Sequence, residues 1–338
     1  MLPSLTVSRA SRVRRSALAA VSLSAVALSL AVGPALAATG FAATVVGGVL
    51  QVRGGSAAEQ IVLRLAAGEP NQLEVLVTGA PGDRATFSLD TFRAITVDAG
   101  NGADEVVIDQ TNGIFTTIKP TSIAGGNGDD TLRGGSGVET FHGGRGNDVV
   151  DGNGGADTAF LDQGDDVFIW DPGDASDVVE GGAGSDTMVF NGAPGNEIMA
   201  ATASGGRVLF TRNLGGIVMD LDDVEAIDVR ALGGADTVTI GSASGTDLRR
   251  VDVDLAGTLG GASSDTVADS VTVEGTAGSD SITASAEAGA VEVTGLAASV
   301  RVKSADADRD RLVIDTGAGN DTVAVDPDVE GLMLVTVQ

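Results

Sequence analysis

Between residues 125 and 189 the chain alternates glycine-rich stretches with single strongly apolar positions, which return at nearly every ninth residue. The residues at these positions are Leu132, Phe141, Val150, Ala159, Phe168, Val179 and Met188, with two extra residues in the 170–174 stretch. A fixed short period is typical of a solenoid, in which stacked repeats bury one face against each other. The pattern therefore predicts an all-β region of short strands and turns, with the repeating apolar side chains inside the coil.

The turns between these apolar positions each carry an acidic residue at the sixth position of their block. If two blocks form one coil, acidic residues 18 positions apart stack in columns. One column is Asp130, Asp148, Asp166 and Asp186, and the other is Glu139, Asp157 and Asp177. Stacked coils lie ~4.8 Å apart, and unit charges at ~5 Å repel by roughly 3 kcal/mol at an effective dielectric constant near 20. A cation between the coils removes this repulsion, and Ca²⁺ takes about six to eight oxygen ligands from carboxylates and carbonyls.

With their Gly-Gly-x-Gly-x-Asp pattern, as in residues 125–130 and 143–148, the blocks resemble the hemolysin-type (RTX) calcium-binding repeat over about 65 residues. The resemblance implies a parallel β-roll that binds Ca²⁺ between successive turns. It implies as ligands the side chains of Asp130, Asp148, Asp157, Asp166, Asp177 and Asp186 and the backbone of Gly126, Gly128, Gly144 and Gly146. Glu139 and Leu161-Asp162 depart from the pattern, so we expect weaker binding at their turns. The alternative, a flexible Gly/Asp-rich linker, does not account for the constant phase.

The flanks carry a looser form of the same pattern. Residues 95–109 match residues 312–326 without a gap, and both are typical of a strand, an acidic glycine turn and a second strand. We therefore expect an N-terminal β-repeat unit over 38–120, the RTX block over 121–190 and C-terminal β-repeat units over 191–338, with one helical turn at 220–227. The flank turns carry Asp104, Asp236, Asp280 and Asp321. A solitary turn has no stacked counterpart to share an ion, so metal binding at these turns is left open.

The first 37 residues have the pattern of a secretory signal peptide. Four arginines precede an uncharged run over 16–33, and Ala35-Leu36-Ala37 is a small-residue cleavage site. A retained membrane anchor is the alternative, because the run approaches spanning length, and Arg14-Arg15 leaves a twin-arginine signal open. We expect cleavage, no stable membrane insertion afterwards and a secreted or extracellular location, with periplasm and cell surface left open.

Charge and composition narrow the classes of function. The formal net charge of −27 argues against nucleic acid as a partner, because phosphate binding needs a basic surface. His142 is the only histidine, tyrosine and cysteine are absent, and neither His-Glu-x-x-His nor Gly-x-Ser-x-Gly occurs. We therefore expect a non-enzymatic, secreted calcium-binding β-solenoid with a structural or adhesive role at the cell surface or matrix. The alternative is a polysaccharide-binding or polysaccharide-modifying protein that uses the acidic solenoid face, and glycans or other cell-surface proteins are open as partners beside calcium.

Overall fold

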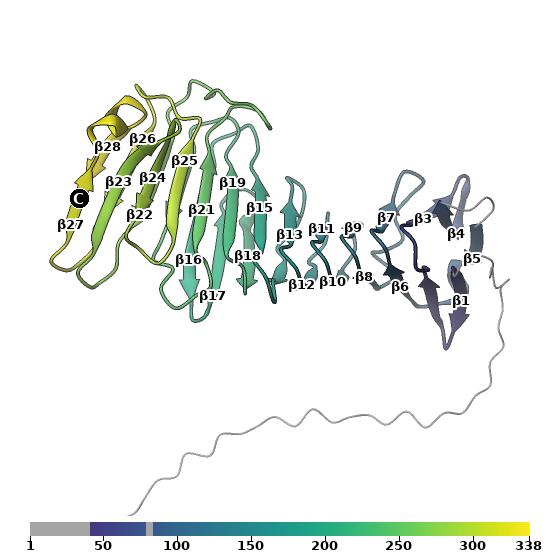
Figure 1. Ribbon diagram of the computed structural model, residues 1–338. Coiled ribbons are helices and arrows are strands. Elements are labelled where there is room, and N and C mark those ends of the chain that lie inside the picture. Colours follow the sequence, from purple (N-terminus) through teal and green to yellow (C-terminus); the bar gives the residue numbers. More distant parts are fainter. Residues whose placement is uncertain (1–40, 79–83) are drawn as a thin grey trace, which may run out of the picture. The chain divides into compact units, whose positions relative to one another are not determined.

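The computed structural model describes residues 41–78 and 84–338, and the predicted signal peptide over 1–37 lies outside this part. Within the described residues the regular structure is β-strand with three short 3₁₀ helices and no α-helix (Figure 1). The 3₁₀ helices are η1 (Leu89–Thr91), η2 (Leu214–Gly216) and η3 (Pro327–Gly331). The strands form two sheets of 14 strands each, which we call sheet A and sheet B.

In order across sheet A, the strands are β1 (Ala42–Val46), β2 (Val49–Arg53), β6 (Ala94–Asn101), β8 (Thr121–Asn127), β10 (Glu139–Arg145), β12 (Thr158–Gln163), β14 (Val178–Glu180), β18 (Ile217–Asp222), β17 (Arg207–Arg212), β16 (Ile198–Ser204), β20 (Thr237–Ile240), β22 (Ser270–Glu274), β26 (Arg311–Asp315) and β28 (Leu334–Val337). In order across sheet B, they are β27 (Thr322–Val325), β23 (Ser281–Glu287), β24 (Ala290–Thr294), β25 (Ser299–Lys303), β21 (Arg250–Asp254), β19 (Ala226–Arg230), β15 (Thr187–Asn191), β13 (Val167–Trp170), β11 (Val149–Asp151), β9 (Thr131–Arg133), β7 (Glu105–Asp109), β3 (Gln60–Ala66), β4 (Glu69–Thr78) and β5 (Arg84–Ser88).

Each coil of the central block contributes one strand to each sheet. Strands β8, β10, β12 and β14 pair in parallel in sheet A, and β9, β11, β13 and β15 pair in parallel in sheet B. Figure 1 shows β8 to β13 following one another in this alternation. The prediction of an all-β, parallel solenoid is therefore confirmed.

The core of the block is a ladder of the predicted apolar positions. Phe141 lies in register with Ala159 in sheet A, and Val150 lies in register with Phe168 in sheet B. All seven predicted residues are at most 1% exposed. Because successive side chains of a strand point to opposite faces, one inward residue per short strand is enough to fill the space between the two sheets.

The two extra residues of the repeat lie in the loop between β13 and β14. Trp170 at the end of β13 is fully buried, and its indole N–H donates a 2.8 Å hydrogen bond to the carbonyl oxygen of Ala175. Its ring stacks on Phe190 with a centroid separation of 4.2 Å. The indole thus fills and closes the longer turn, while β12 and β14 keep their parallel register.

The flanks insert antiparallel strands into the same two sheets. Strands β3, β4 and β5, strands β16, β17 and β18, and strands β23, β24 and β25 each form an antiparallel ladder. The internal repeat has a structural counterpart, because β6 and β26 lie in sheet A and β7 and β27 in sheet B. The prediction of a helical turn at 220–227 is wrong: this segment ends β18 and begins β19, and Leu221 and Ile227 are buried in the core. Both sheets include strands on either side of residues 120 and 190, so the division into units at these positions stays a proposal.

Candidate metal centre

The sixth-position acidic residues stack in the two columns that the spacing predicts. In the first acidic column (Asp130, Asp148, Asp166 and Asp186), each backbone N–H donates to Oδ1 of the next member, at 2.8, 2.6 and 2.9 Å. In the second acidic column (Glu139, Asp157 and Asp177), the same bonds measure 2.7 and 2.8 Å. Each aspartate of the two columns therefore holds the preceding coil through one of its two carboxylate oxygens.

The position of these residues in the chain explains the geometry. Asp130 lies directly before β9, and its carbonyl oxygen accepts a 2.8 Å hydrogen bond from the N–H of Val149 in the next coil. Its own N–H lies outside the strand ladder, where a buried donor needs another partner. The Asp148 side chain provides that partner.

The second oxygen of most of these carboxylates has no hydrogen-bond partner although it is buried. This holds for Oδ2 of Asp130, Asp148, Asp157, Asp166 and Asp186 and for Oε1 of Glu139. These residues are at most 2% exposed. A buried oxygen of this kind is costly unless it is protonated or bound to a cation.

In the blocks of Asp130, Asp148, Asp157 and Asp186, the unpartnered oxygen lies against the first glycine of the block. A Cβ atom on Gly125 would stand 2.4 Å from Asp130 Oδ2 and 2.7 Å from the carbonyl oxygen of Gly143 in the next coil. A Cβ atom on Gly143 would meet Asp148 Oδ2 at 2.6 Å and the carbonyl oxygen of Leu161 at 2.5 Å. Carboxylate and carbonyl oxygens thus converge where glycine leaves room, and such oxygens are the ligands that Ca²⁺ prefers.

The glycines that the resemblance implies have a different environment. Gly126, Gly128, Gly144 and Gly146 all have φ between +113° and +127°, which favours glycine. A Cβ atom on Gly144 would stand 2.2 Å from the carbonyl oxygen of Gly126, and one on Gly146 would stand 2.2 Å from that of Gly128. They therefore allow the turns to stack closely, and their role as backbone ligands stays a proposal. Sequence reasoning missed the first glycines, although the paired Gly-Gly of most blocks was a signal for them.

Burial governs the protonation of the columns. It raises the pKa of Asp148 to about 7 and that of Asp157 to about 8, and neighbouring carboxylates add to the rise. The same cause raises the pKa to about 6 for Asp130 and Asp166 and to about 7 for Asp177 and Asp186. Without a cation, stacked carboxylates at neutral pH are therefore held in an environment that disfavours their charge.

Glu139, expected to weaken its turn, occupies the same place in the second column. Its Oε2 accepts a 2.8 Å hydrogen bond from the N–H of Gly135, and its Oε1 is unpartnered. The side chain is fully buried, and burial raises its pKa. The longer side chain is thus accommodated without leaving the column.

The flank turns are not solitary. The N–H of Asp104 donates to Asp130 Oδ1 at 2.7 Å, and the N–H of Asp280 donates to Asp321 Oδ1 at 2.9 Å. Glu59 also belongs to such a ladder. Sequence reasoning missed four further acidic residues in these ladders, namely Glu197, Glu225, Asp269 and Asp310. Their shared signal is an acidic residue immediately before a strand with apolar side chains at alternate positions.

A second ladder at the fifth positions runs in the opposite direction. The N–H of Asn147 donates to Oδ1 of Asp129 at 2.8 Å, and the N–H of Asp165 donates to Oδ1 of Asn147 at 3.0 Å. Here each coil donates to the coil before it, whereas at the sixth positions it donates to the coil after it. Successive turns are therefore fixed to each other in both directions.

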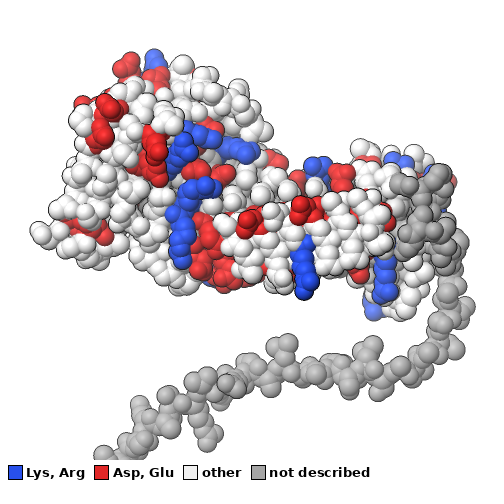
Figure 2. Space-filling view, in the orientation of Figure 1, with Lys and Arg blue, Asp and Glu red and all other residues white. Residues whose placement is uncertain are grey.

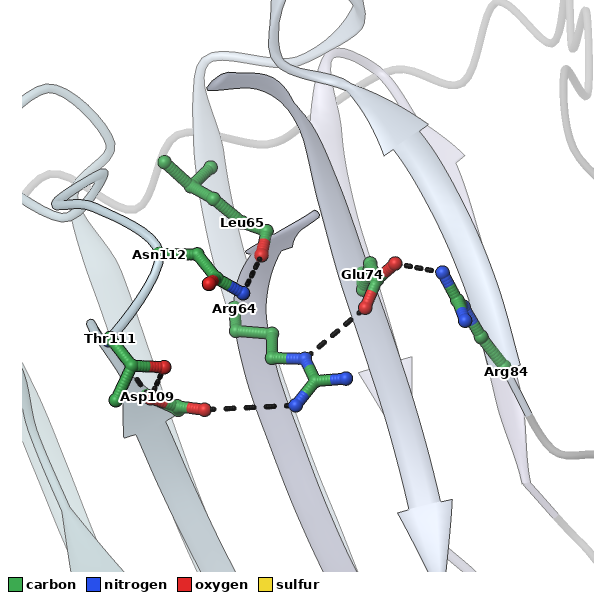
Figure 3. Close-up of polar contacts among 7 residues, drawn as sticks. All are labelled: Arg64, Leu65, Glu74, Arg84, Asp109, Thr111 and Asn112. Carbon is green, nitrogen blue, oxygen red and sulfur yellow. Dashed lines mark hydrogen bonds and ion pairs between the residues drawn. The ribbon is translucent and has the colours of Figure 1, made fainter. Parts of the chain in front are cut away.

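One buried acidic residue outside these columns, Glu74, has basic partners. Glu74 on β4 is 3% exposed and forms ion pairs with Arg64 and Arg84 (Figure 3). Arg64 also lies 3.9 Å from Asp109, whose carboxylate accepts a hydrogen bond from Thr111. Figure 2 shows wide neutral stretches between the charged side chains of the visible surface. Within the described residues, no ion pair neutralises the first or second acidic column, so these columns differ from Glu74 in lacking a protein cation.

Comparisons with known proteins agree with this geometry. The family model described as RTX calcium-binding nonapeptide repeat (4 copies) matches the chain over residues 122–150, 133–168 and 173–201. This part of the chain therefore carries RTX calcium-binding repeats, and its metal is Ca²⁺. A search of curated proteins finds no match to this chain. Over residues 41–78 and 84–338, no helix has the length and apolar character needed to cross a membrane.

Proposed function

We propose that the protein is a secreted, non-enzymatic β-solenoid that folds around calcium and serves as a structural or adhesive component of the cell surface or matrix. The observation that carries this proposal is the row of buried, unpartnered carboxylate oxygens in the two acidic columns. A chain without cysteine has no disulfide to stabilise it outside the cell, so stacked coils and bound metal provide the stability.

We assign the metal ligands to the sixth positions of the repeats. The proposed side-chain ligands are Asp130, Asp148, Asp157, Asp166, Asp177 and Asp186, and Gly126, Gly128, Gly144 and Gly146 are proposed to contribute backbone oxygens. The carbonyl oxygens of Gly143 and Leu161 join this proposal because they lie beside the unpartnered carboxylate oxygens. When bound, Ca²⁺ supplies the positive charge that allows adjacent carboxylates to remain ionised.

The calcium affinity of such sites determines when folding is completed relative to export. Extracellular calcium modules bind in the range of roughly 10⁻⁴ to 10⁻³ M. Sites of that affinity stay empty at cytoplasmic calcium concentrations and fill outside the cell, so folding is completed after export. The predicted signal peptide over 1–37 supports this order of events.

Far-UV circular dichroism of the full-length protein tests the proposal. The protein is placed in chelator and then titrated with Ca²⁺ and, separately, with Mg²⁺. We expect a cooperative gain of β signal at sub-millimolar to millimolar Ca²⁺ and a much weaker response to Mg²⁺, which prefers a smaller octahedral site. A spectrum that is already rich in β signal in chelator and does not respond to Ca²⁺ would contradict calcium-coupled folding.

The glycan alternative has one feature in its favour. A depression of about 520 Å³ is lined in part by Gln110, Arg133, Asn153 and Asp174, which are polar residues able to bind sugar hydroxyls. A screen of acidic and neutral polysaccharides, with and without Ca²⁺, separates the two functions. Binding of the wild type to a polysaccharide that is lost in Arg133→Ala and Asp174→Asn favours glycan recognition. Turnover of a polysaccharide overturns the non-enzymatic assignment.

A further inference from the structure

A third column of acidic residues lies in sheet A, and all of its members except the first lie beyond residue 201, where the repeat match ends. This C-terminal acidic column consists of Glu197, Asp236, Asp269 and Asp310, each directly before one of the adjacent strands β16, β20, β22 and β26. Each backbone N–H donates to Oδ1 of the next member, at 2.8, 2.8 and 2.9 Å. The column thus repeats the hydrogen bonding of the calcium-binding block with a different sequence.

The two ends of the column are closed by protein groups. Glu197 is fully buried and forms an ion pair with Arg212, and its Oε2 accepts a 2.8 Å hydrogen bond from the N–H of Ala193. Asp310 accepts the N–H of Asp269 at Oδ1 and the N–H of Asp306 at Oδ2. Both carboxylate oxygens of Glu197 and of Asp310 therefore have a protein partner.

The two middle members each have one carboxylate oxygen without a protein partner. Asp236 is 2% exposed and Asp269 is 3% exposed, and the Oδ2 atom of each is buried without a hydrogen-bond partner. Their strands β20 and β22 are parallel neighbours, so the two carboxylates belong to successive coils. Two unpartnered buried oxygens on adjacent coils are the feature that the calcium-binding block shows at Asp148 and Asp166.

A further carboxylate raises the negative charge at this place. Asp265 accepts hydrogen bonds from the N–H groups of Gly234 and Val267, at 2.7 Å each. Gly234 lies two residues before Asp236, and Val267 lies two residues before Asp269, so the Asp265 carboxylate is held beside the segments that carry both. Within the described residues, no arginine or lysine forms an ion pair with Asp236, Asp265 or Asp269.

We propose that the C-terminal acidic column holds a Ca²⁺ ion of its own between Asp236 Oδ2 and Asp269 Oδ2, with Asp265 contributing charge. The site is separate from the repeats and does not depend on the ligands proposed there. Its donors are oxygens alone, and backbone carbonyls and water complete the shell of such a hard cation. The structure thus assigns a metal site to the C-terminal part of the solenoid, where the sequence has no RTX motif.

Calcium stoichiometry of the full-length protein tests this site. Equilibrium dialysis compares the wild type with the double variant Asp236→Asn/Asp269→Asn and with Asp328→Asn, a control that removes one exposed carboxylate. Asparagine keeps the Oδ1 acceptor that the column needs and removes the charge. We expect the double variant to bind one Ca²⁺ fewer than the wild type and the control to bind the same number. Equal stoichiometry in all three proteins overturns the proposal.

Thermal unfolding gives a second readout, which distinguishes a metal site from a structural role. In chelator the double variant should melt at or above the temperature of the wild type, because it no longer stacks two unneutralised carboxylates. In saturating Ca²⁺ it should melt below the wild type. If the double variant loses its β signal, the single variants Asp236→Asn and Asp269→Asn are measured in the same two assays, and a folded single variant with wild-type stoichiometry and wild-type melting in Ca²⁺ also overturns the proposal.

Discussion

The backbone N–H of Asp148 donates a 2.6 Å hydrogen bond to Oδ1 of Asp166, 18 residues further along the chain. Oδ1 of Asp166 is thereby committed to the preceding coil, and its Oδ2 remains buried and unpartnered. One carboxylate thus has two separate tasks, since one oxygen satisfies the backbone and the other is available to a metal. Substitutions at this position can separate the two tasks.

We predict different effects for Asp166→Asn and Asp166→Ala. Asparagine keeps the acceptor for the Asp148 N–H, so in chelator this variant should be at least as stable as the wild type. Alanine leaves that N–H buried without a partner, which costs about 1–3 kcal/mol. In Ca²⁺ both variants should show a weaker gain of β signal, and Asp98→Ala, an exposed position, should behave as the wild type. Chemical denaturation with and without chelator measures all four proteins, and identical behaviour of the two Asp166 variants in chelator would contradict the assignment of Oδ1.

A second prediction concerns the close stacking of the turns. Gly144→Ala should destabilise the calcium-loaded protein by about 1–3 kcal/mol, the typical cost of holding a non-glycine residue in a strained backbone region. The reason is that Gly144 has φ +113° and its Cβ atom would stand 2.2 Å from the carbonyl oxygen of Gly126. Gly206→Ala is the matched control, because nothing lies within 4 Å of a Cβ atom there. Equal unfolding free energies for the two variants would show that the turns have room to relax.

The central block was predictable because its residues repeat every nine positions, with one insertion of two residues. Phe141 and Val150 lie inside the coil, as the nine-residue period indicates, and Asp130 and Asp148 stack, as two blocks per coil require. In this segment the inward apolar residues and the stacked acidic residues both follow the same nine-residue period, so the period predicts the coil. The metal-ligand residues of the block were proposed from the resemblance to the RTX repeat, and their binding of Ca²⁺ stays a prediction.

The flank ladders were harder to predict because their members are far apart in sequence. Asp236 and Asp269 are 33 residues apart and Asp269 and Asp310 are 41 apart, with loops or antiparallel strands between them. No constant spacing remains to be detected, and the glycine-rich turn is missing before Asp269. The stacking follows from strand pairing over long distances, which a local pattern does not encode. The prediction of a helical turn at 220–227 was wrong for a related reason. Burial of Leu221 and Ile227 in the two sheets outweighs the local preference of this segment for a helical turn.

The stability of the metal-free protein and its affinity for Ca²⁺ should change with pH in opposite directions. Burial raises the pKa of Asp148 to about 7 and that of Asp157 to about 8, from the ordinary aspartate value of 3.8. The folded metal-free protein therefore binds more protons than the unfolded chain between about pH 4 and pH 8, and its stability falls as the pH rises through this window. Ca²⁺ competes with the same protons, so calcium affinity should increase over the same window.

Denaturant unfolding in chelator at about pH 5.5, 7 and 8.5 measures the first trend, and calcium titrations at the same pH values measure the second. The variant Asp148→Asn/Asp157→Asn is the control, because it lacks two of the titrating groups and should show a flatter pH dependence in both assays. Stability in chelator that rises from pH 5.5 to 8.5 would contradict the protonation of the buried columns.

The ion pair between Arg212 and Glu197 provides the last prediction. Glu197 is fully buried and Arg212 is 8% exposed, so Arg212→Met leaves a buried carboxylate without its partner and should cost about 3–5 kcal/mol. Glu197→Gln in the same chain should recover much of that loss, because the amide can still accept hydrogen bonds and carries no charge.

Arg309→Met removes an ion pair with Asp306 at the surface and should have a much smaller effect. Trp170, the only tryptophan, lies 5.2 Å from the Arg212 guanidinium, so its fluorescence reports unfolding at this place. A loss in Arg212→Met that Glu197→Gln does not reduce would assign the effect to the contact with Trp170 and not to the buried charge.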